Sequence, residues 1–207
     1  MELTTTFTKK GRINVLADGE YQFTVPAFIW YASSLCGETE AEPEALEALR
    51  LEGESSDAYE KALRLLGQRA HGEAELKRKL RQKYSPAAVE SAMAKLRESR
   101  LVDDAAFADA LAEELYRRKA WAPERILQEL LSRGIDAETA KNAVNGLDID
   151  RKQGIIDIIS KMRLPDAPTK KDVDRLLRRL LAAGYSMREI REVVEISDGT
   201  AMQDDGA

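Results

Sequence analysis

The sequence repeats a pattern of apolar residues at an interval of 50 positions. Two apolar positions of the first copy have counterparts 50 and 100 residues later: Leu76, Ile126 and Leu176, then Leu80, Leu130 and Leu180. Within each copy the apolar residues recur every three or four positions, which is the spacing of one face of an α-helix. Such a period is typical of a tandem array of supersecondary units. The chain is therefore expected to be mainly α, built from copies of one helical unit.

The last turn of each unit carries its own signals. Gly134 and Gly184 stand at equivalent positions, where a helix ends in a left-handed residue, so both are predicted to have a positive φ. Asp136 and Ser186 follow where the next helix needs an N-cap. The first copy is one residue shorter here, and Ser85 takes the capping position. Each unit is thus predicted to contain three helices, the last two arranged like a helix-turn-helix.

These signals divide the chain into a short N-terminal region, three repeats and a tail. The three-helix repeats are expected to begin where the helical spacing begins and to follow one another without long linkers. The tail is acidic and is expected to be disordered. The predicted segments are 1–56, 57–104, 105–150, 151–196 and 197–207.

The N-terminal segment 1–25 predicts a β-hairpin rather than helices. The dipeptide Asp18-Gly19 tolerates the two positive φ angles of a type I′ turn. The runs 13–17 and 20–25 on either side have the composition and alternation of paired strands. The run 3–8 is a candidate third strand.

Two short helices are expected after Pro26, over residues 27–35 and 44–51. The stretch 53–56 reads Gly-Glu-Ser-Ser, which is the composition of a linker. Ser56 or Asp57 would then cap the first helix of the first repeat.

The formal net charge of −5 conceals an uneven distribution. Residues 1–56 hold four Lys and Arg against ten Asp and Glu, and residues 197–207 hold three Asp and no basic residue. The region 57–196 between them therefore carries a charge of +4. Because this middle region is basic, the place where its positive charge gathers is informative about a partner.

The chain offers little for catalysis. It lacks the G-x-x-x-x-G-K-[ST] and G-x-G-x-x-G motifs of nucleotide sites. Its one histidine, His71, precedes a helix and is expected to be exposed or to cap it. The one cysteine, Cys36, is interpreted as a small apolar residue, and Asp103 and Asp104 are interpreted as a helix start. We therefore expect no enzyme activity, no metal and no cofactor.

Most aromatic residues are assigned to packing. One helical face carries several of them together with leucines: Phe107, Leu111, Leu115 and Tyr116. Trp30 and Trp121 are also expected to pack, although Trp121, at a corner between helices, could instead contact a partner.

The basic side chains are the remaining candidates for function. They crowd together on the second helix of the first repeat and on the equivalent helix of the third repeat: Lys77, Arg78, Lys79 and Arg81, then Arg175, Arg178 and Arg179. The middle repeat has Gln128 and Glu129 at the matching positions. Each residue alone is compatible with a solvated helix face, but the pattern as a whole favours a partner-binding surface.

Three stretches of the chain resemble the family of regulatory proteins called RecX. The run Leu101-Val-Asp-Asp-Ala-Ala-Phe-Ala108 is similar to an acidic, aromatic-ended junction of that family, and Pro123–Ile135 is similar to its central helix and turn. Arg69–Leu76, followed by Lys79-Leu80, is similar to its first repeat. The resemblance covers about residues 57–196, and departs from the family at Ala122 and Tyr84, where glycine is common at or beside the position.

The resemblance implies a modulator of the RecA recombinase. Its members lodge in the groove of the RecA filament on single-stranded DNA and oppose filament growth, ATP hydrolysis, strand exchange and co-protease activity. It implies roles in DNA repair, homologous recombination and the SOS response, and weak direct contact with DNA. The alternatives are a helix-turn-helix nucleic-acid-binding protein and a generic helical adaptor.

Location and assembly are expectations of the same kind. No apolar run approaches the roughly 18 residues of a membrane span, and the N-terminus does not resemble a secretory signal. A monomer in the cytoplasm, with no membrane partner, is expected.

Overall fold

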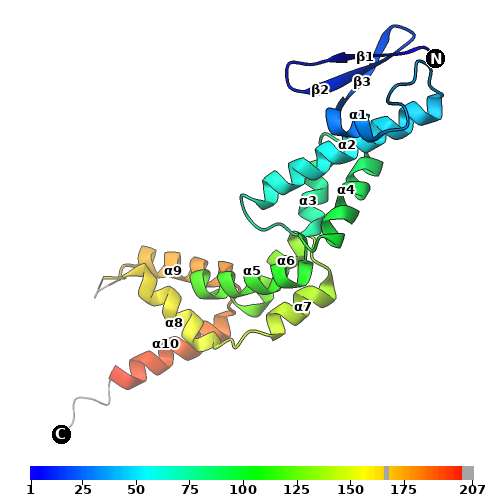
Figure 1. Ribbon diagram of the computed structural model, residues 1–207. Helices are drawn as coiled ribbons and strands as arrows, with labels where there is room; N and C mark the ends of the chain where they lie inside the picture. Colours follow the sequence, from blue (N-terminus) through cyan, green and yellow to red (C-terminus); the bar gives the residue numbers. More distant parts are fainter. Residues whose placement is uncertain (166–167, 202–207) are drawn as a thin grey trace. The chain divides into compact units, whose positions relative to one another are not determined.

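The computed structural model describes residues 1–165 and 168–201 of the chain (Figure 1). These residues form three strands and ten helices. They divide into two compact units, Met1–Asp103 and the part of the chain that begins at Asp104. No described helix is long and apolar enough to cross a membrane.

The N-terminal sheet has the order β1-β2-β3 and is antiparallel throughout. Its strands are β1 (Leu3–Phe7), β2 (Arg12–Ala17) and β3 (Glu20–Pro26). Asp18 and Gly19 have φ angles of 50° and 77°, so both residues of the β2–β3 turn are left-handed, as the Asp-Gly dipeptide predicted. The predicted hairpin and third strand are confirmed.

The two helices that follow differ in length from the prediction. Helix α1 spans Ala27–Ala32, and α2 runs without interruption from Pro43 to Leu66. The predicted helix over 44–51 is present but does not end at residue 51, so the linker over 53–56 and the cap at Ser56 or Asp57 are wrong. The predicted boundary between residues 56 and 57 falls inside α2.

Packing against the sheet explains why Gly53 belongs to a helix. A Cβ built on Gly53 would lie 2.5 Å from Cγ1 of Val25 in β3, so only glycine lets α2 approach the sheet this closely. Ser55 is buried two residues later, and its Oγ donates to Oγ of Ser91 at 2.8 Å. The polar composition of this stretch thus serves internal contacts of a helix rather than a linker.

Three sets of three helices make up the repeats. The first uses the second half of α2 with α3 (Glu73–Leu80) and α4 (Pro86–Glu98). The second contains α5 (Asp104–Lys119), α6 (Pro123–Ser132) and α7 (Ala137–Asn145). The third contains α8 (Arg151–Met162), α9 (Lys170–Ala182) and α10 (Met187–Ala201). The mainly helical fold with three tandem repeats agrees with the sequence prediction. The predicted tail, 197–207, lies partly outside the described residues.

The predicted turn chemistry is confirmed at each repeat. Gly134 and Gly184 have φ angles of 86° and 95°. The Asp136 side chain accepts hydrogen bonds from the backbone N–H groups that begin α7. The Ser85 side chain accepts from the third residue of α4, and Ser186 Oγ accepts in the same way at α10. These side chains satisfy donors that have no partner within the helix.

Each repeat buries its own apolar cluster. Leu76, Leu80, Ile126, Leu130 and Leu180 are fully buried, and Leu176 is partly buried. Burying one such side chain is worth about 1.5–3 kcal/mol relative to leaving it exposed, so each repeated position contributes to the stability of its own repeat. The aromatic predictions hold, because Trp30 is buried and Phe107, Tyr116 and Trp121 pack against cores while partly exposed.

The second and third repeats are joined by contacts at one corner. The Ala122 N–H donates to the Ala183 carbonyl at 2.9 Å. The Tyr185 hydroxyl, almost completely buried, donates to the Ala120 carbonyl at 2.8 Å. Burial raises the pKa of Tyr185 to about 12, so this hydroxyl stays protonated as a donor.

The prediction for Cys36 is wrong. The residue is exposed rather than packed as a small apolar side chain. It lies in the turn after α1, directly before Gly37, whose φ of 93° is left-handed. The turn keeps this side chain at the surface.

Candidate partner-binding surface

The predicted basic residues lie on two helices of different compact units. Lys77, Arg78 and Lys79 belong to α3, and Arg81 follows it directly. Arg175, Arg178 and Arg179 belong to α9. The two groups differ in one respect that the sequence did not predict, which is whether nearby carboxylates neutralise them.

Most of the α3 group is paired within its own repeat. Lys77 Nζ lies 3.1 Å from Glu73 and 3.0 Å from Glu90, and Arg81 lies 2.9 Å from Glu90. Lys79 Nζ lies 3.3 Å from the carboxylate of Glu75. Arg78 is exposed and has no ion pair among the described residues. The positive charge of α3 is therefore largely compensated before any partner arrives.

Glu75 is the buried centre of this arrangement. Burial alone would raise its pKa, but Arg69, whose Nη2 lies 2.5 Å away, acts with His71 and Lys79 to lower that pKa to about 2. The carboxylate is therefore ionised at neutral pH and holds basic side chains around it. Sequence reasoning missed Glu75 and Arg69, although His71 and Glu75 have the i, i+4 spacing of helix neighbours.

The prediction for His71 is wrong. Its side chain is buried rather than exposed, and it does not cap α3, which has no side-chain cap. Its Nδ1 lies 3.2 Å from Glu75 Oε2. Burial lowers the pKa of His71, opposed by the neighbouring carboxylate, so the ring is neutral at physiological pH. The ring is thus a buried, neutral group beside charged neighbours, Arg69, Glu75 and Lys79.

The α9 group is exposed and unneutralised. Arg178 Nε donates to the Asp174 carbonyl at 3.2 Å, yet none of the three arginines forms an ion pair within residues 1–165 and 168–201. Two further exposed lysines at the start of α9, which sequence reasoning missed, are equally unpaired within the same described ranges. We call this set the α9 basic face: Lys170, Lys171, Arg175, Arg178 and Arg179.

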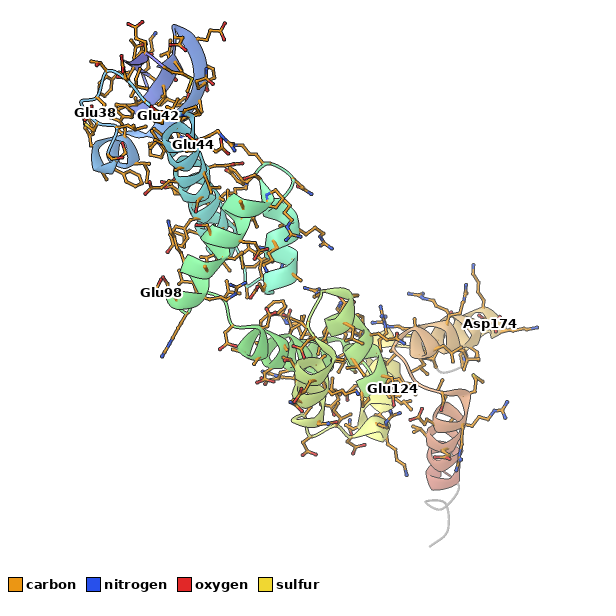
Figure 2. The ribbon with its side chains drawn as sticks, turned by 90° about the vertical axis from the view of Figure 1, so that its right-hand side faces the viewer. Glu38, Glu42, Glu44, Glu98, Glu124 and Asp174 are labelled. Atoms are coloured by element: carbon orange, nitrogen blue, oxygen red, sulfur yellow. The ribbon has the colours of Figure 1, made fainter. Side chains whose placement is uncertain are left out.

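Local structure explains why Asp172 of α9 forms no ion pair with this face, although Arg175 contributes to lowering its pKa. Asp172 closes a capping box with Thr169, so its carboxylate accepts from the backbone N–H and hydroxyl of Thr169. These bonds lower the pKa of Asp172 and keep it ionised at the helix start. Figure 2 shows Asp174 on α9 among side chains tipped with nitrogen.

The second repeat differs at the matching positions, as the sequence predicted. Gln128 is neutral, and Glu129 forms an ion pair with Arg133 at 3.0 Å. Two cations near these positions lie over an aromatic ring. Lys119 Nζ and Arg125 Cζ are 4.3 Å and 4.5 Å from the centre of the Trp121 ring. The second repeat therefore has no counterpart of Arg178 and Arg179 at its matching positions.

The α9 basic face can bind anions. Guanidinium groups offer several donors in a fixed plane to a carboxylate or phosphate, and ammonium groups act as point charges. Among the described residues no cluster of His, Cys, Asp and Glu has the arrangement of a metal site. The chemistry that this surface supports is electrostatic recognition of a partner.

The fold and this surface define a class, that of proteins built from tandem three-helix units. Family models for the first and second three-helix domains of RecX match residues 58–96 and 103–144. The regulatory protein RecX of Chlorobaculum tepidum is 34% identical over 146 residues, which cover 70% of this chain and 91% of that protein. The chain belongs to the RecX family of regulatory proteins.

Two further comparisons agree with this assignment. The regulatory protein RecX of Clostridium beijerinckii is 26% identical over 192 residues, covering 90% of this chain and 89% of the relative. A crystal structure of regulatory protein RecX matches with a TM-score of 0.63 at 21% identity and covers 94% of this chain and 98% of that chain. The crystal structure supports the fold, and the family resemblance identified in the sequence is confirmed.

Proposed function

We propose that this protein modulates the RecA recombinase, mainly as an inhibitor. In this proposal it binds in the groove of the RecA filament on single-stranded DNA and limits filament growth, ATP hydrolysis, strand exchange and co-protease activity. Membership of a family of regulatory proteins supports a regulatory role. The RecA partner rests on the family resemblance of the sequence.

The α9 basic face supports the proposal because it offers a means of binding the filament. A filament on single-stranded DNA presents phosphates and acidic side chains, and exposed cations without internal partners can replace its counterions. The α3 residues Lys77, Lys79 and Arg81 would contribute less, because carboxylates of the same repeat already hold them. Arg78 is the α3 residue most available to a partner, since it has no ion pair among the described residues.

Binding alone is sufficient for such a regulator. In the proposal the protein turns over no substrate, needs no cofactor and acts as a monomer in the cytoplasm, with only weak direct contact with DNA. Its roles would lie in DNA repair, homologous recombination and the SOS response.

The test is RecA-dependent ATP hydrolysis on single-stranded DNA with substoichiometric amounts of this protein. A regulator that acts on filaments should reduce the steady-state rate of ATP hydrolysis by a larger fraction than the molar ratio of this protein to RecA. An unchanged rate would contradict the proposal. The helix-turn-helix alternative instead requires tight binding to bare duplex DNA without RecA, which a parallel titration measures.

A further inference from the structure

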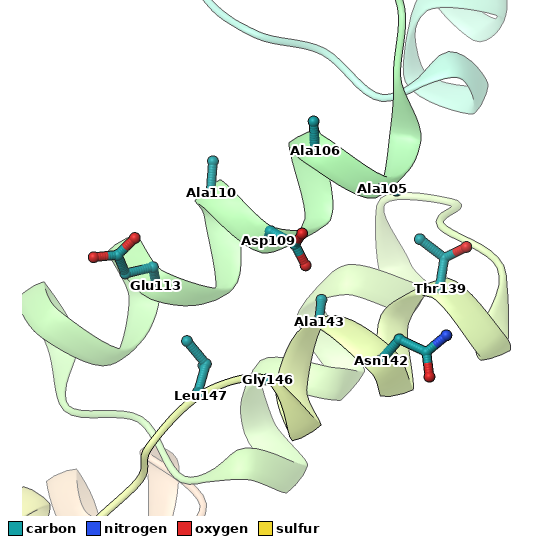
Figure 3. Close-up of a pocket in the computed structure, with 10 residues that line it drawn as sticks. All are labelled: Ala105, Ala106, Asp109, Ala110, Glu113, Thr139, Asn142, Ala143, Gly146 and Leu147. Atoms are coloured by element: carbon teal, nitrogen blue, oxygen red, sulfur yellow. The ribbon is translucent and has the colours of Figure 1, made fainter.

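A groove runs between α5 and α7 of the second repeat (Figure 3). Its volume is about 790 Å³, and a second hollow of about 460 Å³ continues along α5 and shares Ala110 and Glu113 with it. Together they follow α5 from Ala105 to Arg118, a length of about 20 Å at 1.5 Å per residue. That length corresponds to about four turns of a docked helix.

Small side chains leave this groove open. Ala105, Ala106 and Ala110 of α5 are exposed, and Ala143 and Gly146 line the opposite side. Alanine and glycine at a helix surface let a second helix approach closely, because no side chain stands between the two backbones.

The first repeat shows the same place filled. By the 50-residue shift, Ser55 and Tyr59 of α2 correspond to Ala105 and Asp109 of α5. Ser55 bonds Ser91 of α4 at 2.8 Å, and Tyr59 packs against the core of that repeat. At the positions of these two contacts, the second repeat has Ala105 and Asp109, which do not fill the space between the helices. The opening is therefore a local property of the second repeat and not a consequence of the three-helix fold.

The lining of the groove is acidic. Asp109 and Glu113 line it from α5, whereas neither Lys nor Arg does so. In the second hollow each arginine is already paired with a glutamate of α5: Arg117 with Glu113, and Arg118 with Glu114. Figure 3 shows the Asp109 carboxylate between the two helices, and Asp109 has no ion pair among the described residues. Because Arg117 already holds Glu113, the charge that the groove offers to a partner is that of Asp109, which disfavours phosphate and attracts Lys or Arg. We therefore take the occupant to be a protein segment rather than nucleic acid.

We propose that the α5–α7 groove receives a basic helix of the filament protein. The helix would place small aliphatic side chains on the alanine floor and a Lys or Arg beside Asp109, as helices dock in grooves elsewhere. This inference rests on the proposed function, because the helix belongs to RecA. The protein then holds the filament at two places of opposite charge, with the α9 basic face toward acidic groups and the groove toward a basic helix.

Two variants test the groove. Ala110→Trp fills it, and Asp109→Lys reverses its charge. The matched controls are Ala87→Trp and Glu98→Lys, which make the same changes at exposed positions of α4 outside the groove. Binding of fluorescently labelled protein is measured against RecA filaments on single-stranded DNA and against the bare DNA, after equal urea midpoints show that every variant is folded.

Both groove variants should lose about tenfold in filament affinity, which is the scale of losing one well-packed contact, while the controls and the binding of bare DNA stay unchanged. If the groove variants bind filaments as well as the controls do, the proposal that the groove binds a helix is wrong, and the proposed function is unaffected. Tighter filament binding by Asp109→Lys would also overturn that proposal, because the groove would then face phosphate. If the wild-type protein does not bind filaments, the proposed function fails and the proposed occupant fails with it.

Discussion

The hydroxyl of Tyr185 occupies the space that a side chain at residue 154 would need, since a Cβ built on Gly154 would lie 2.1 Å from that oxygen. The same hydroxyl donates to the carbonyl of Ala120. One phenol thus ties together the start of α8, the end of α5 and the turn before α10. The contact requires glycine at 154, the fourth residue of α8, where glycine is otherwise unfavourable.

Gly154→Ala should therefore destabilise the protein, contrary to the usual effect of alanine in a helix. Helix propensity favours the change by about 1 kcal/mol, but overpacking against Tyr185 costs about 1–3 kcal/mol. Urea unfolding measures the difference. Gly67→Ala, whose Cβ would meet only helix carbonyls at 3.4 Å or more, is the control and should be neutral or stabilising. Adding Tyr185→Phe should recover part of the loss, and equal effects of Gly154→Ala with and without it would contradict this explanation.

The repeat turns should tolerate alanine poorly. Gly134→Ala and Gly184→Ala each place a Cβ in the left-handed region, at a cost of about 1 kcal/mol. Gly184→Ala should cost more, because its Cβ would also lie 2.8 Å from Cβ of Arg125. Chemical denaturation measures the unfolding free energies of the two variants and shows which loses more stability. A Gly184→Ala protein as stable as the wild type would refute the role of Gly184 in ending α9.

The α9 basic face should determine filament affinity without affecting stability. Reversing Arg178 and Arg179 to Glu changes the charge by four units at exposed, unpaired positions, so the unfolding free energy should move by less than about 0.5 kcal/mol. Filament affinity should fall strongly, and the salt dependence of binding should become shallower because fewer counterions are released. The matched control is Lys152→Glu with Arg191→Glu, the same change at exposed positions of α8 and α10 that have no ion pair among the described residues. Equal losses in both double variants would remove the specific role of α9.

Acid should weaken the first repeat through Glu75. Its folded pKa of about 2 lies below the ordinary value of 4.5, so the folded state binds fewer protons than the unfolded chain. The resulting stability, on the order of 3 kcal/mol, is nearly complete above about pH 5 and is lost as the pH falls toward 2. Glu75→Gln should therefore be less stable than wild type at pH 7, with the gap closing below pH 4. A gap independent of pH would show that the ionised carboxylate contributes nothing.

Local signals in the sequence predicted the repeats well. A capping residue such as Asp136 and a left-handed residue such as Gly134 act within one turn of the chain, so their neighbours in sequence determine their role. The linker prediction failed because Gly53 is explained by Val25, which is remote in the sequence and lies on a strand. No local pattern reports such a contact.

The candidate site was predictable in composition but not in charge balance. Lys77 and Arg178 look equivalent in the sequence, since both belong to basic runs on amphipathic helices. They differ because Glu90 of α4 reaches Lys77, whereas no described carboxylate pairs with Arg178. The contact with Glu90 arises only when α3 and α4 pack, whereas the contact with Glu73, four residues before Lys77 on the same helix, could have been found in the sequence. The seven residues therefore remain a predicted surface, and we propose that α9 with Arg78 is the part of it most available to a partner.

The unbroken α2 makes the N-terminal sheet and the first repeat mechanically one body. Its 24 residues form a rod about 36 Å long, with Gly53 against the sheet and Ser55 against α4. Because α2 is continuous, a displacement of the sheet also displaces α4. Any molecule that binds strands β1 to β3 therefore also fixes the orientation of the first three-helix bundle.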